Sequence, residues 1–189
     1  MKPLLDEEKI KETSEFYEQI HRTEMDYLAY WQENTLWQWE FWVSVLFSVV
    51  PWVIWFVFRK RGSEARLLLA GLFVILIASL LDFLGVVFGI WHYSGKALPI
   101  IPSYVPWDFT LLPVTVMFWL QIKPKSNPFL KAVIFAAISA FIGEYLFEWL
   151  GLYTPKEWRS IYSFPIYIVI YLIADRISRT GAFKPLDEN

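Results

Sequence analysis

The sequence predicts an all-α, polytopic membrane helix bundle with five transmembrane helices and an N-terminal amphipathic helix. The first observation is composition: of 189 residues, 56% are hydrophobic and 20% are aromatic, and the mean hydropathy is positive. A soluble core of this size cannot bury so much apolar surface, whereas a bilayer accepts it. The second observation is that long apolar segments alternate with turns that carry prolines or clustered charges.

Charge and cysteine content exclude several classes of function. The formal net charge is −2, so the chain has no basic surface of the kind that binds nucleic acid. It contains no cysteine, which excludes disulfides, thiolate nucleophiles and thiolate metal sites. The first residues, MKPLLDEEKIKETSEF, are acidic where a signal peptide would be basic and then apolar. We therefore expect no cleaved secretion signal.

Residues 1–38 are predicted to form an amphipathic helical arm. Between 4 and 38, charged residues alternate with an apolar stripe at helical spacing, formed by Ile10, Tyr17, Ile20, Tyr27 or Leu28, and Trp31. Two interpretations stay open: a solvated helix beside the bundle, or an arm that binds a partner. Beyond the stripe, a predicted aromatic belt at headgroup level consists of Trp31, Trp37, Trp39 and Trp42.

Residues 39–180 are predicted to form the five-helix transmembrane domain. Its first span covers about 39–58, with a kink at Pro51, and Ser63 caps the second, about 64–90. The third runs from Pro106 to about 122, with proline at the first helical position and Asp108 in the first turn, where the helix dipole favours a negative charge.

The fourth predicted span, 129–150, follows the start signal Asn127-Pro128. Thr154-Pro155-Lys156-Glu157 has the pattern of a capping box, so a short helix is expected before the fifth span, which ends near 178. Pro165 either kinks that helix or begins its membrane portion. Residues 181–189 are expected to form a short polar tail.

The distribution of positive residues predicts a multi-pass protein of the bacterial cytoplasmic membrane, with its N-terminus outside and its C-terminus cytoplasmic. One face would collect Arg59, Lys60, Arg61, Arg66, Lys123, Lys125, Lys131, Arg176, Arg179 and Lys184. The opposite loops hold only Lys96, Lys156 and Arg159.

Four carboxylates fall in the outer half of the predicted bundle: Asp82, Asp108, Glu144 and Glu148. A charged group in lipid costs about 2.5–3.5 kcal/mol on insertion scales, so such a residue is expected to have a function. The acids also continue seams of small residues, Ala78 with Gly85 and Gly89 in one helix and Ala132, Ala136 and Ala140 in another, and such seams face other helices. We therefore predict a shared, outward-facing pocket.

Aromatic and imidazole side chains at the same level complete the predicted ligand-binding set, namely Trp91, His92, Tyr93, Tyr104 and Tyr162. Three further tyrosines at this level could bond to the carboxylates or line the pocket, namely Tyr145, Tyr153 and Tyr167. Each acid also has a structural interpretation. Asp108 could act only by stabilising its helix through the helix dipole, and Glu148 could lie at the surface in contact with water. Asp82 and Glu144 could be ion-paired or neutral carboxyls. His92 could be a hydrogen-bonded residue of the belt.

No phosphate-binding loop, zinc-protease motif or nucleophile elbow is present in the sequence. The acidic pocket predicts binding of a small cation or cationic ligand, in a sensor, a permeation element or a complex subunit. A second hypothesis is an intramembrane enzyme in which Glu144 or Asp108 acts as acid on an isoprenoid or lipid. A third is a scaffold for another membrane protein. The lipid bilayer is the expected partner. A membrane-protein partner or a second copy is left open, and no cofactor or metal can be named.

Two resemblances accompany these residues. The succession from Asp82 through Trp91-His92-Tyr93 and Pro106-Trp107-Asp108 to Glu144, Glu148 and Ile161-Tyr162-Ser163-Phe164-Pro165 resembles an uncharacterised family of small multi-spanning membrane proteins from spore-forming Gram-positive bacteria. This resemblance covers about 40–180 and implies a cytoplasmic-membrane location without an established activity. Pro106-Trp107-Asp108 also resembles a turn of the lycopene cyclase domain, although the paired glutamates of that family are absent here.

Overall fold

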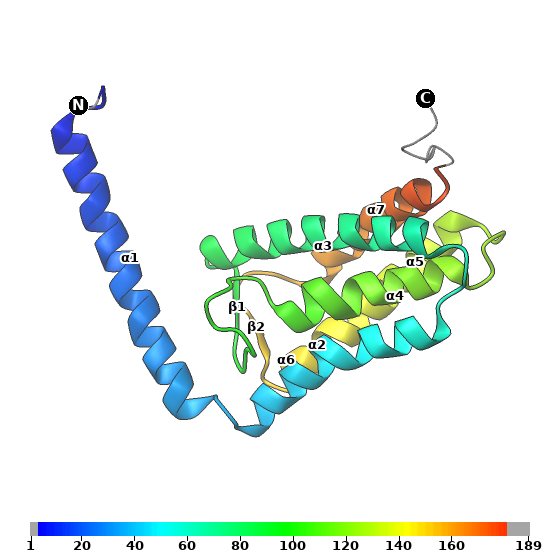
Figure 1. Cartoon of the computed structure of the whole chain (residues 1–189), viewed down its shortest axis with the longest axis horizontal. Coiled ribbons are helices and arrows are strands. Elements are labelled where there is room, and N and C mark those ends of the chain that lie inside the picture. Colours follow the sequence, from blue (N-terminus) through cyan, green and yellow to red (C-terminus); the bar gives the residue numbers. More distant parts are fainter. Residues whose placement is uncertain (1–3, 181–189) are drawn as a thin grey trace.

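The computed structural model describes residues 4–180, and most of them are helical (Figure 1). The predicted tail at 181–189 lies outside this range. The longer helices are α1 (Glu7–Asn34), α2 (Trp39–Phe58), α3 (Glu64–Val87), α4 (Leu112–Gln121), α5 (Pro128–Ile138) and α7 (Ser160–Ser178). Between them lie the short α6 (Glu144–Trp149), the π-helical segments η1 (Pro106–Leu111) and η2 (Ser139–Gly143), and the strands β1 (Trp91–Tyr93) and β2 (Tyr153–Pro155).

Four helical stretches in the described residues are long and apolar enough to cross a membrane: Trp39–Phe58, Glu64–Val87, Pro128–Trp149 and Ser160–Ser178. They match four of the five predicted spans. The remaining one, predicted from 106 to about 122, is a π-helical segment followed by α4, and Pro106 to Gln121 rises only about 24 Å at 1.5 Å per residue. That is short of the roughly 30 Å of a bilayer's hydrocarbon core, so a fifth span is not confirmed.

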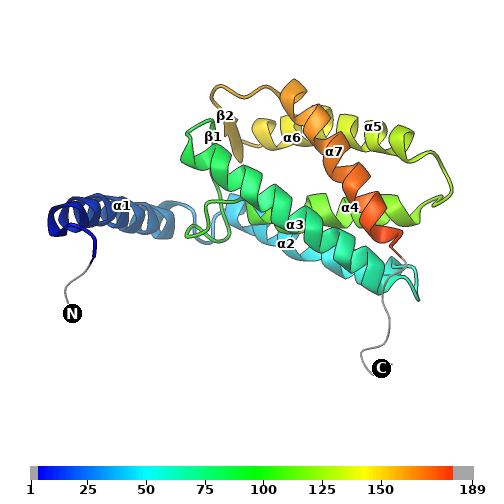
Figure 2. The same ribbon diagram turned by 90° about the horizontal axis from the view of Figure 1, so that it is seen from above.

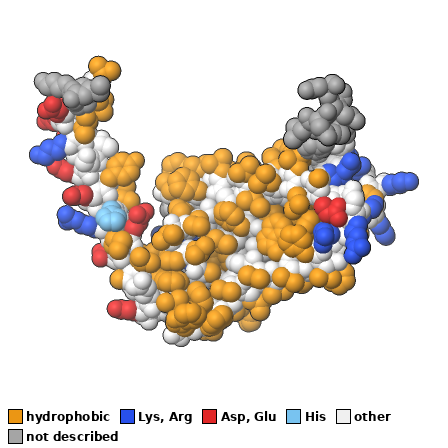
Figure 3. Space-filling model, viewed as in Figure 1, with side chains coloured by type: hydrophobic (Ala, Val, Ile, Leu, Met, Phe, Trp, Pro, Cys, Tyr) orange, Lys and Arg blue, Asp and Glu red, His pale blue; other side chains and the backbone are white. Residues whose placement is uncertain are grey.

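The core of the bundle lies between α2, α3, α4, α5 and α7. Trp55, Val74, Met117, Phe135 and Tyr171 are fully buried or nearly so within it. Ala132, Ala136 and Ala140 are completely buried along α5 and η2, so the predicted alanine seam faces other helices. In contrast, the outer surfaces of the helices are covered by apolar side chains (Figure 3).

Lysine and arginine side chains gather at one end of the bundle, where the α2–α3 and α4–α5 turns meet the end of α7 (Figures 1 and 3). Asn127 caps α5 there as predicted, since its side chain accepts hydrogen bonds from the backbone N–H groups of Phe129 and Leu130 at 2.9 and 3.3 Å. Ser63 occupies the position before α3 but makes no side-chain capping bond.

The opposite end of the bundle is closed by an antiparallel pairing of β1 and β2, in which His92 lies opposite Thr154. The prediction of a short helix at Thr154 is therefore wrong: the segment pairs with β1, and α7 begins only at Ser160. The capping-box pattern was misleading because the backbone groups of this segment are satisfied by strand pairing instead. Lys156 extends the contact, its N–H donating to the Ile90 carbonyl at 2.9 Å.

The seam that was predicted to face another helix does not continue through Gly85 and Gly89. A Cβ on Gly85 would lie 1.9 Å from Cζ2 of Trp91, so this glycine makes room for an indole ring. Gly89 lies past the end of α3 with φ of +69°, the left-handed conformation that ends many helices. The two glycines thus shape the turn from α3 into β1.

Replacing Gly85 with Ala should force the Trp91 ring out of its place. We expect Gly85→Ala to lower the free energy of unfolding by about 1–3 kcal/mol, the usual cost of an overpacked site. The measurement is the thermal midpoint in detergent. In the double variant Gly85→Ala/Trp91→Leu the overlap is gone, so its loss should be smaller than the sum of the two single losses. Additive losses would contradict this account of Gly85.

Candidate functional site

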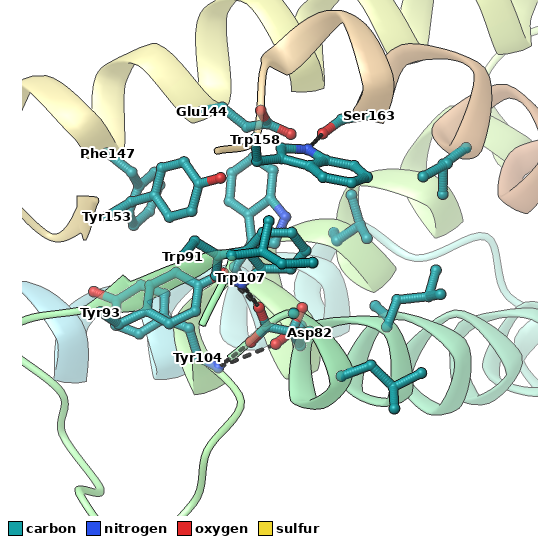
Figure 4. A pocket seen from close by; sticks show the side chains of 18 of the residues that line it. Asp82, Trp91, Tyr93, Tyr104, Trp107, Glu144, Phe147, Tyr153, Trp158 and Ser163 are labelled. Atoms are coloured by element: carbon teal, nitrogen blue, oxygen red, sulfur yellow. Dashed lines mark hydrogen bonds between the residues drawn. The ribbon is translucent and has the colours of Figure 1, made fainter. Parts of the chain in front are cut away.

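A cavity of about 230 Å³ lies inside the bundle near the β1–β2 end (Figure 4). Its walls come from α3, β1, η1, α6, β2 and α7. Most of the lining is apolar or aromatic, and the carboxyl groups in it are those of Asp82, Asp108 and Glu144. Asp82 and Glu144 lie on opposite sides of the cavity (Figure 4).

Asp82, on α3, is 5% exposed and is held by three donors. Its Oδ1 accepts hydrogen bonds from Trp91 Nε1 at 2.7 Å and from the Tyr93 hydroxyl at 2.6 Å. Its Oδ2 accepts from the backbone N–H of Tyr104 at 2.9 Å. A buried carboxylate needs such donors to offset its desolvation, and here they tie α3 to β1 and to the loop before η1.

Asp108 accepts a hydrogen bond from the same backbone N–H group as Asp82. Its Oδ2 accepts from the Tyr104 N–H at 3.1 Å, and its side chain is only 2% exposed. Two carboxyl groups that share one donor repel each other when both are ionised, and a single proton held between such groups removes the repulsion. The loop ending at Tyr104 thus brings together two acids that are far apart in the sequence.

Glu144 begins α6 directly after the π-helical segment η2. Its Oε1 accepts a hydrogen bond from the Tyr167 hydroxyl at 3.0 Å, and that hydroxyl accepts one from Trp107 Nε1 at 3.2 Å. The second oxygen, Oε2, is buried and accepts no hydrogen bond of good geometry within residues 4–180, although the hydroxyl groups of Ser160 and Ser163 lie close to this carboxyl group. Glu144 therefore keeps an acceptor in the wall of the cavity that no described donor reaches with good geometry.

Each of the two π-helical segments contains or directly precedes an acid of the cavity. η1 contains Asp108, and η2 ends at Gly143, one residue before Glu144. The Trp107 ring fills the space at Gly143, where an added Cβ would lie 2.5 Å from Cη2 of that ring. A π-helical turn rotates the side chains that follow it, and such turns are frequent at functional sites.

Aromatic rings form much of the remaining wall. Tyr93 and Tyr104 are stacked with ring centroids 4.7 Å apart, and Trp91 meets the ring of Trp158 edge to face at 5.1 Å. Trp158 Nε1 donates to the hydroxyl of Ser163 at 2.8 Å. These rings combine an apolar face with satisfied polar groups, so the wall can accept hydrocarbon or a cation.

Lys96 lies beside this site and is buried, with 6% of its surface exposed. Its Nζ donates to the carbonyl oxygens of Ile101 and Pro102 at 2.7 and 2.6 Å, and no carboxylate of the described residues forms an ion pair with it. Burial lowers the pKa of Lys96 to about 8, against an opposing influence of the Asp82 and Asp108 charges. The ammonium group thereby fastens the loop that carries Tyr104.

The six predicted residues that line the cavity are Asp82, Trp91, Tyr93, Tyr104, Asp108 and Glu144. The other three do not line it. Glu148 is exposed, because it lies on the turn of α6 that leaves the bundle. His92 points away from the site, since successive side chains of β1 alternate and its neighbours Trp91 and Tyr93 point inward. Tyr162 is 47% exposed, and its ring meets that of the lining residue Trp158 edge to face, with the centroids 5.5 Å apart.

Tyr153 and Tyr167 were predicted to lie at the level of the acids, where they could bond to carboxylates or line a pocket, and both line the cavity. Four residues of the site were not predicted as ligand contacts, namely Lys96, Trp107, Trp158 and Ser163. Lys96 carries no signal in the sequence, since a single lysine in a loop is expected at the surface.

Within residues 4–180, no three His, Asp or Glu side chains come close enough to hold a metal ion. The three carboxyl groups of the cavity are instead divided between two hydrogen-bond networks, one at Tyr104 and one at Tyr167.

Fold and site together define a class: a mainly helical protein with four helices long and apolar enough to cross a membrane and an acid-containing pocket at one end. No protein-family model matches the chain, and no curated protein or solved structure is significantly similar to it. The resemblance to an uncharacterised family of membrane proteins therefore stays a prediction.

The pKa of Lys96 makes stability depend on pH. Because its pKa falls from 10.5 to about 8 on folding, the unfolded chain binds more protons between these values, and the free energy of unfolding should rise with pH across this window. From pH 7.5 to 9.5 the gain should be about 1–2 kcal/mol, measured by thermal unfolding in detergent.

Lys96→Met should lose this rise, whereas the exposed Lys125→Met should keep it. The comparison stays below pH 10, because burial raises the pKa of Tyr104 to about 12, and such a tyrosine lowers stability above its ordinary pKa of 10.0. An identical pH profile for wild type and Lys96→Met would contradict the assignment.

Proposed function

We propose that the chain is a multi-pass protein of the bacterial cytoplasmic membrane with the β1–β2 end outside. The cluster of lysine and arginine side chains at the opposite end supports this orientation, because positive residues are retained on the cytoplasmic side (Figure 3). The arm would then lie outside and the end of α7 inside. The end that we propose to be cytoplasmic carries more lysine and arginine side chains than the β1–β2 end, as this orientation requires.

We propose further that the cavity binds a small amphiphilic molecule whose head group is a cation or a hydrogen-bond donor. The observation that carries this proposal is the buried Oε2 of Glu144, which lies in the cavity wall without a partner in the described residues. Leaving such an acceptor unsatisfied costs about 1–3 kcal/mol, and a donating ligand would recover it. Asp82 accepts three hydrogen bonds and Asp108 is directed at the donor that it shares with Asp82, so Glu144 is the acid whose buried oxygen is left to contact a ligand.

The size and lining of the cavity support an apolar body for this ligand. The volume of about 230 Å³ is below the roughly 300–1,000 Å³ of sites that enclose a drug-sized molecule. A head group with a few carbons fits, and a longer chain would extend beyond the cavity. Leu84, on α3, and Phe88, directly after it, line the cavity and are also 38% and 73% exposed, which supports entry from the bilayer.

The test uses dodecylamine as a cationic probe and dodecanoate as its anionic counterpart, with the full chain in lipid nanodiscs. Dodecylamine should raise the thermal midpoint of the wild type and dodecanoate should not. In Glu144→Gln the apparent affinity for dodecylamine should fall about 10- to 100-fold, since a charge-assisted hydrogen bond contributes about 1.5–3 kcal/mol.

Glu148→Gln is the matched control, because it removes an exposed carboxylate four residues further along the same helix. It should bind dodecylamine like the wild type. Equal binding by wild type and Glu144→Gln, or equal stabilisation by the two probes, would refute the assignment of Glu144 as the head-group contact.

A second candidate function is acid catalysis on an alkene-containing lipid. The observation in its favour is the pair Asp82 and Asp108, which share the Tyr104 N–H beside an aromatic, apolar cavity. A proton held by the pair would add to a carbon–carbon double bond, whose π electrons form the new C–H bond. The resulting carbocation, stabilised by the aromatic faces, would lose a neighbouring proton to the carboxylate and give an isomer of unchanged mass.

This candidate predicts an isomeric lipid in cells that express the protein. Lipid extracts from cells with wild type and with Glu148→Gln should contain a species of unchanged mass and altered chromatographic retention. Asp108→Asn, which keeps the shape but cannot release the proton, should reduce it at least 100-fold. Extracts that do not differ between wild type and Asp108→Asn would exclude this chemistry.

A further inference from the structure

The helix α1 has almost no support from the rest of the molecule. It contains 28 residues, about 42 Å of helix, and none of its side chains is buried. Only Leu28 and Trp31, near its end, are half-buried. Isolated helices are marginal in water and derive most of their stability from packing one face against another surface. The described residues supply no such surface for most of α1.

The apolar stripe of α1 faces the side of the helix on which the bundle lies. Ile10 and Tyr17 are seven residues apart, and Tyr17 and Trp31 are fourteen residues apart. These spacings correspond to about two and four helical turns, so the three side chains share one face. Trp31 is anchored toward the bundle, because its Nε1 donates to the Lys96 carbonyl at 2.7 Å and its ring meets Phe41 at 6.1 Å. Most of the charged side chains lie on the other side (Figure 3).

The direction of α1 differs from that of the bundle helices. Figure 1 shows it running steeply across the direction of α2, and Figure 2 shows it extending outward from the β1–β2 end. At the junction, Trp37, Trp39 and Trp42 are 65%, 58% and 52% exposed. Exposed tryptophans of this kind are typical of the boundary between hydrocarbon and head groups. The apolar stripe therefore continues from that boundary.

We infer that α1 is an in-plane helix that rests on the bilayer at the β1–β2 end, with its apolar stripe among the lipid head groups. The surface of the spanning helices, the exposed tryptophans and the stripe then form one continuous lipid-facing surface. Glu24 lies within the stripe and limits the depth to the polar interface. The inference depends on the proposed membrane location and is independent of the ligand in the cavity.

The lipid surface that fits α1 is zwitterionic. The helix carries the acids Glu7, Glu8, Glu12, Glu15, Glu18, Glu24, Asp26 and Glu33 but only the bases Lys9, Lys11 and Arg22. Basic interfacial helices gain affinity from anionic lipids, and this acidic helix would lose it. Its attachment must come from apolar burial and from its covalent connection to α2.

The test places a fluorophore on each face of α1 in the full chain reconstituted in phosphatidylcholine vesicles. Because the chain has no cysteine, single cysteines can be introduced and labelled with the environment-sensitive dye NBD. Ile20→Cys reports the stripe, and Glu15→Cys reports the charged face. Leu76→Cys, 64% exposed on α3, reports whether the bundle is in the bilayer.

The label at position 20 should emit at shorter wavelength and be quenched by lipids with a nitroxide near the head group, while the label at position 15 should not. The label at position 76 lies near the middle of α3, so it should be quenched by lipids with a nitroxide on the acyl chain. Equal, unquenched emission at 15 and 20 with a quenched label at 76 would overturn the inference but leave the membrane location intact. An unquenched label at 76 would overturn both. If the blue shift at position 20 requires a high protein-to-lipid ratio and lipids do not quench the label, a second copy of the chain covers the apolar stripe. That result would also overturn the inference.

A pair of neighbouring substitutions provides a second measurement. Ile20→Asp places a charge on the stripe, and Gln19→Asp places the same charge on the opposite face. In vesicles, Ile20→Asp should increase the rate of proteolytic cleavage within the arm about 10- to 100-fold, since the charge removes the apolar burial of this side chain. Gln19→Asp should leave the rate unchanged, and equal rates for both variants would refute the inference.

Discussion

The constraint on which this structure depends is that acids buried in an apolar bundle must be supplied with donors from elsewhere in the chain. Asp82 accepts from the Trp91 indole, the Tyr93 hydroxyl and the Tyr104 backbone, and these three bonds determine how the chain leaves α3 and enters η1. Gly85 makes the arrangement sterically possible, because only a residue without a Cβ leaves room for the Trp91 ring. The β1–β2 end is thus built around a single carboxylate.

The same constraint distinguishes the acids from one another. Asp82 is saturated and organises the structure, whereas Glu144 accepts one hydrogen bond from Tyr167 and keeps Oε2 without a partner in the described residues. Lys96 adds a buried ammonium group that is satisfied by the Ile101 and Pro102 carbonyls and not by an acid. Asp82 therefore acts as a structural carboxylate, and Glu144 is the acid that we propose as the ligand contact.

Local deviations from regular structure turn this end of the bundle into a cavity. The π-helical segments η1 and η2 bring Trp107 against Gly143 and place Asp108 and Glu144 beside the same space. An unbroken α-helix at either place would rotate the acids away from their present positions.

The sequence by itself determined the helical class, four of the spans, the cap at Asn127 and the presence of acids on inward faces, because these depend on hydropathy and on spacing along a single helix. Only the tertiary structure decided which acids meet, since that depends on the path of the loop through Tyr104 and on the pairing of Trp91–Tyr93 with Tyr153–Pro155. It also decided that Thr154 lies in a strand, that Glu148 and His92 face outward, and that Lys96 is buried. Such contacts join residues far apart in the chain, and no local periodicity encodes them.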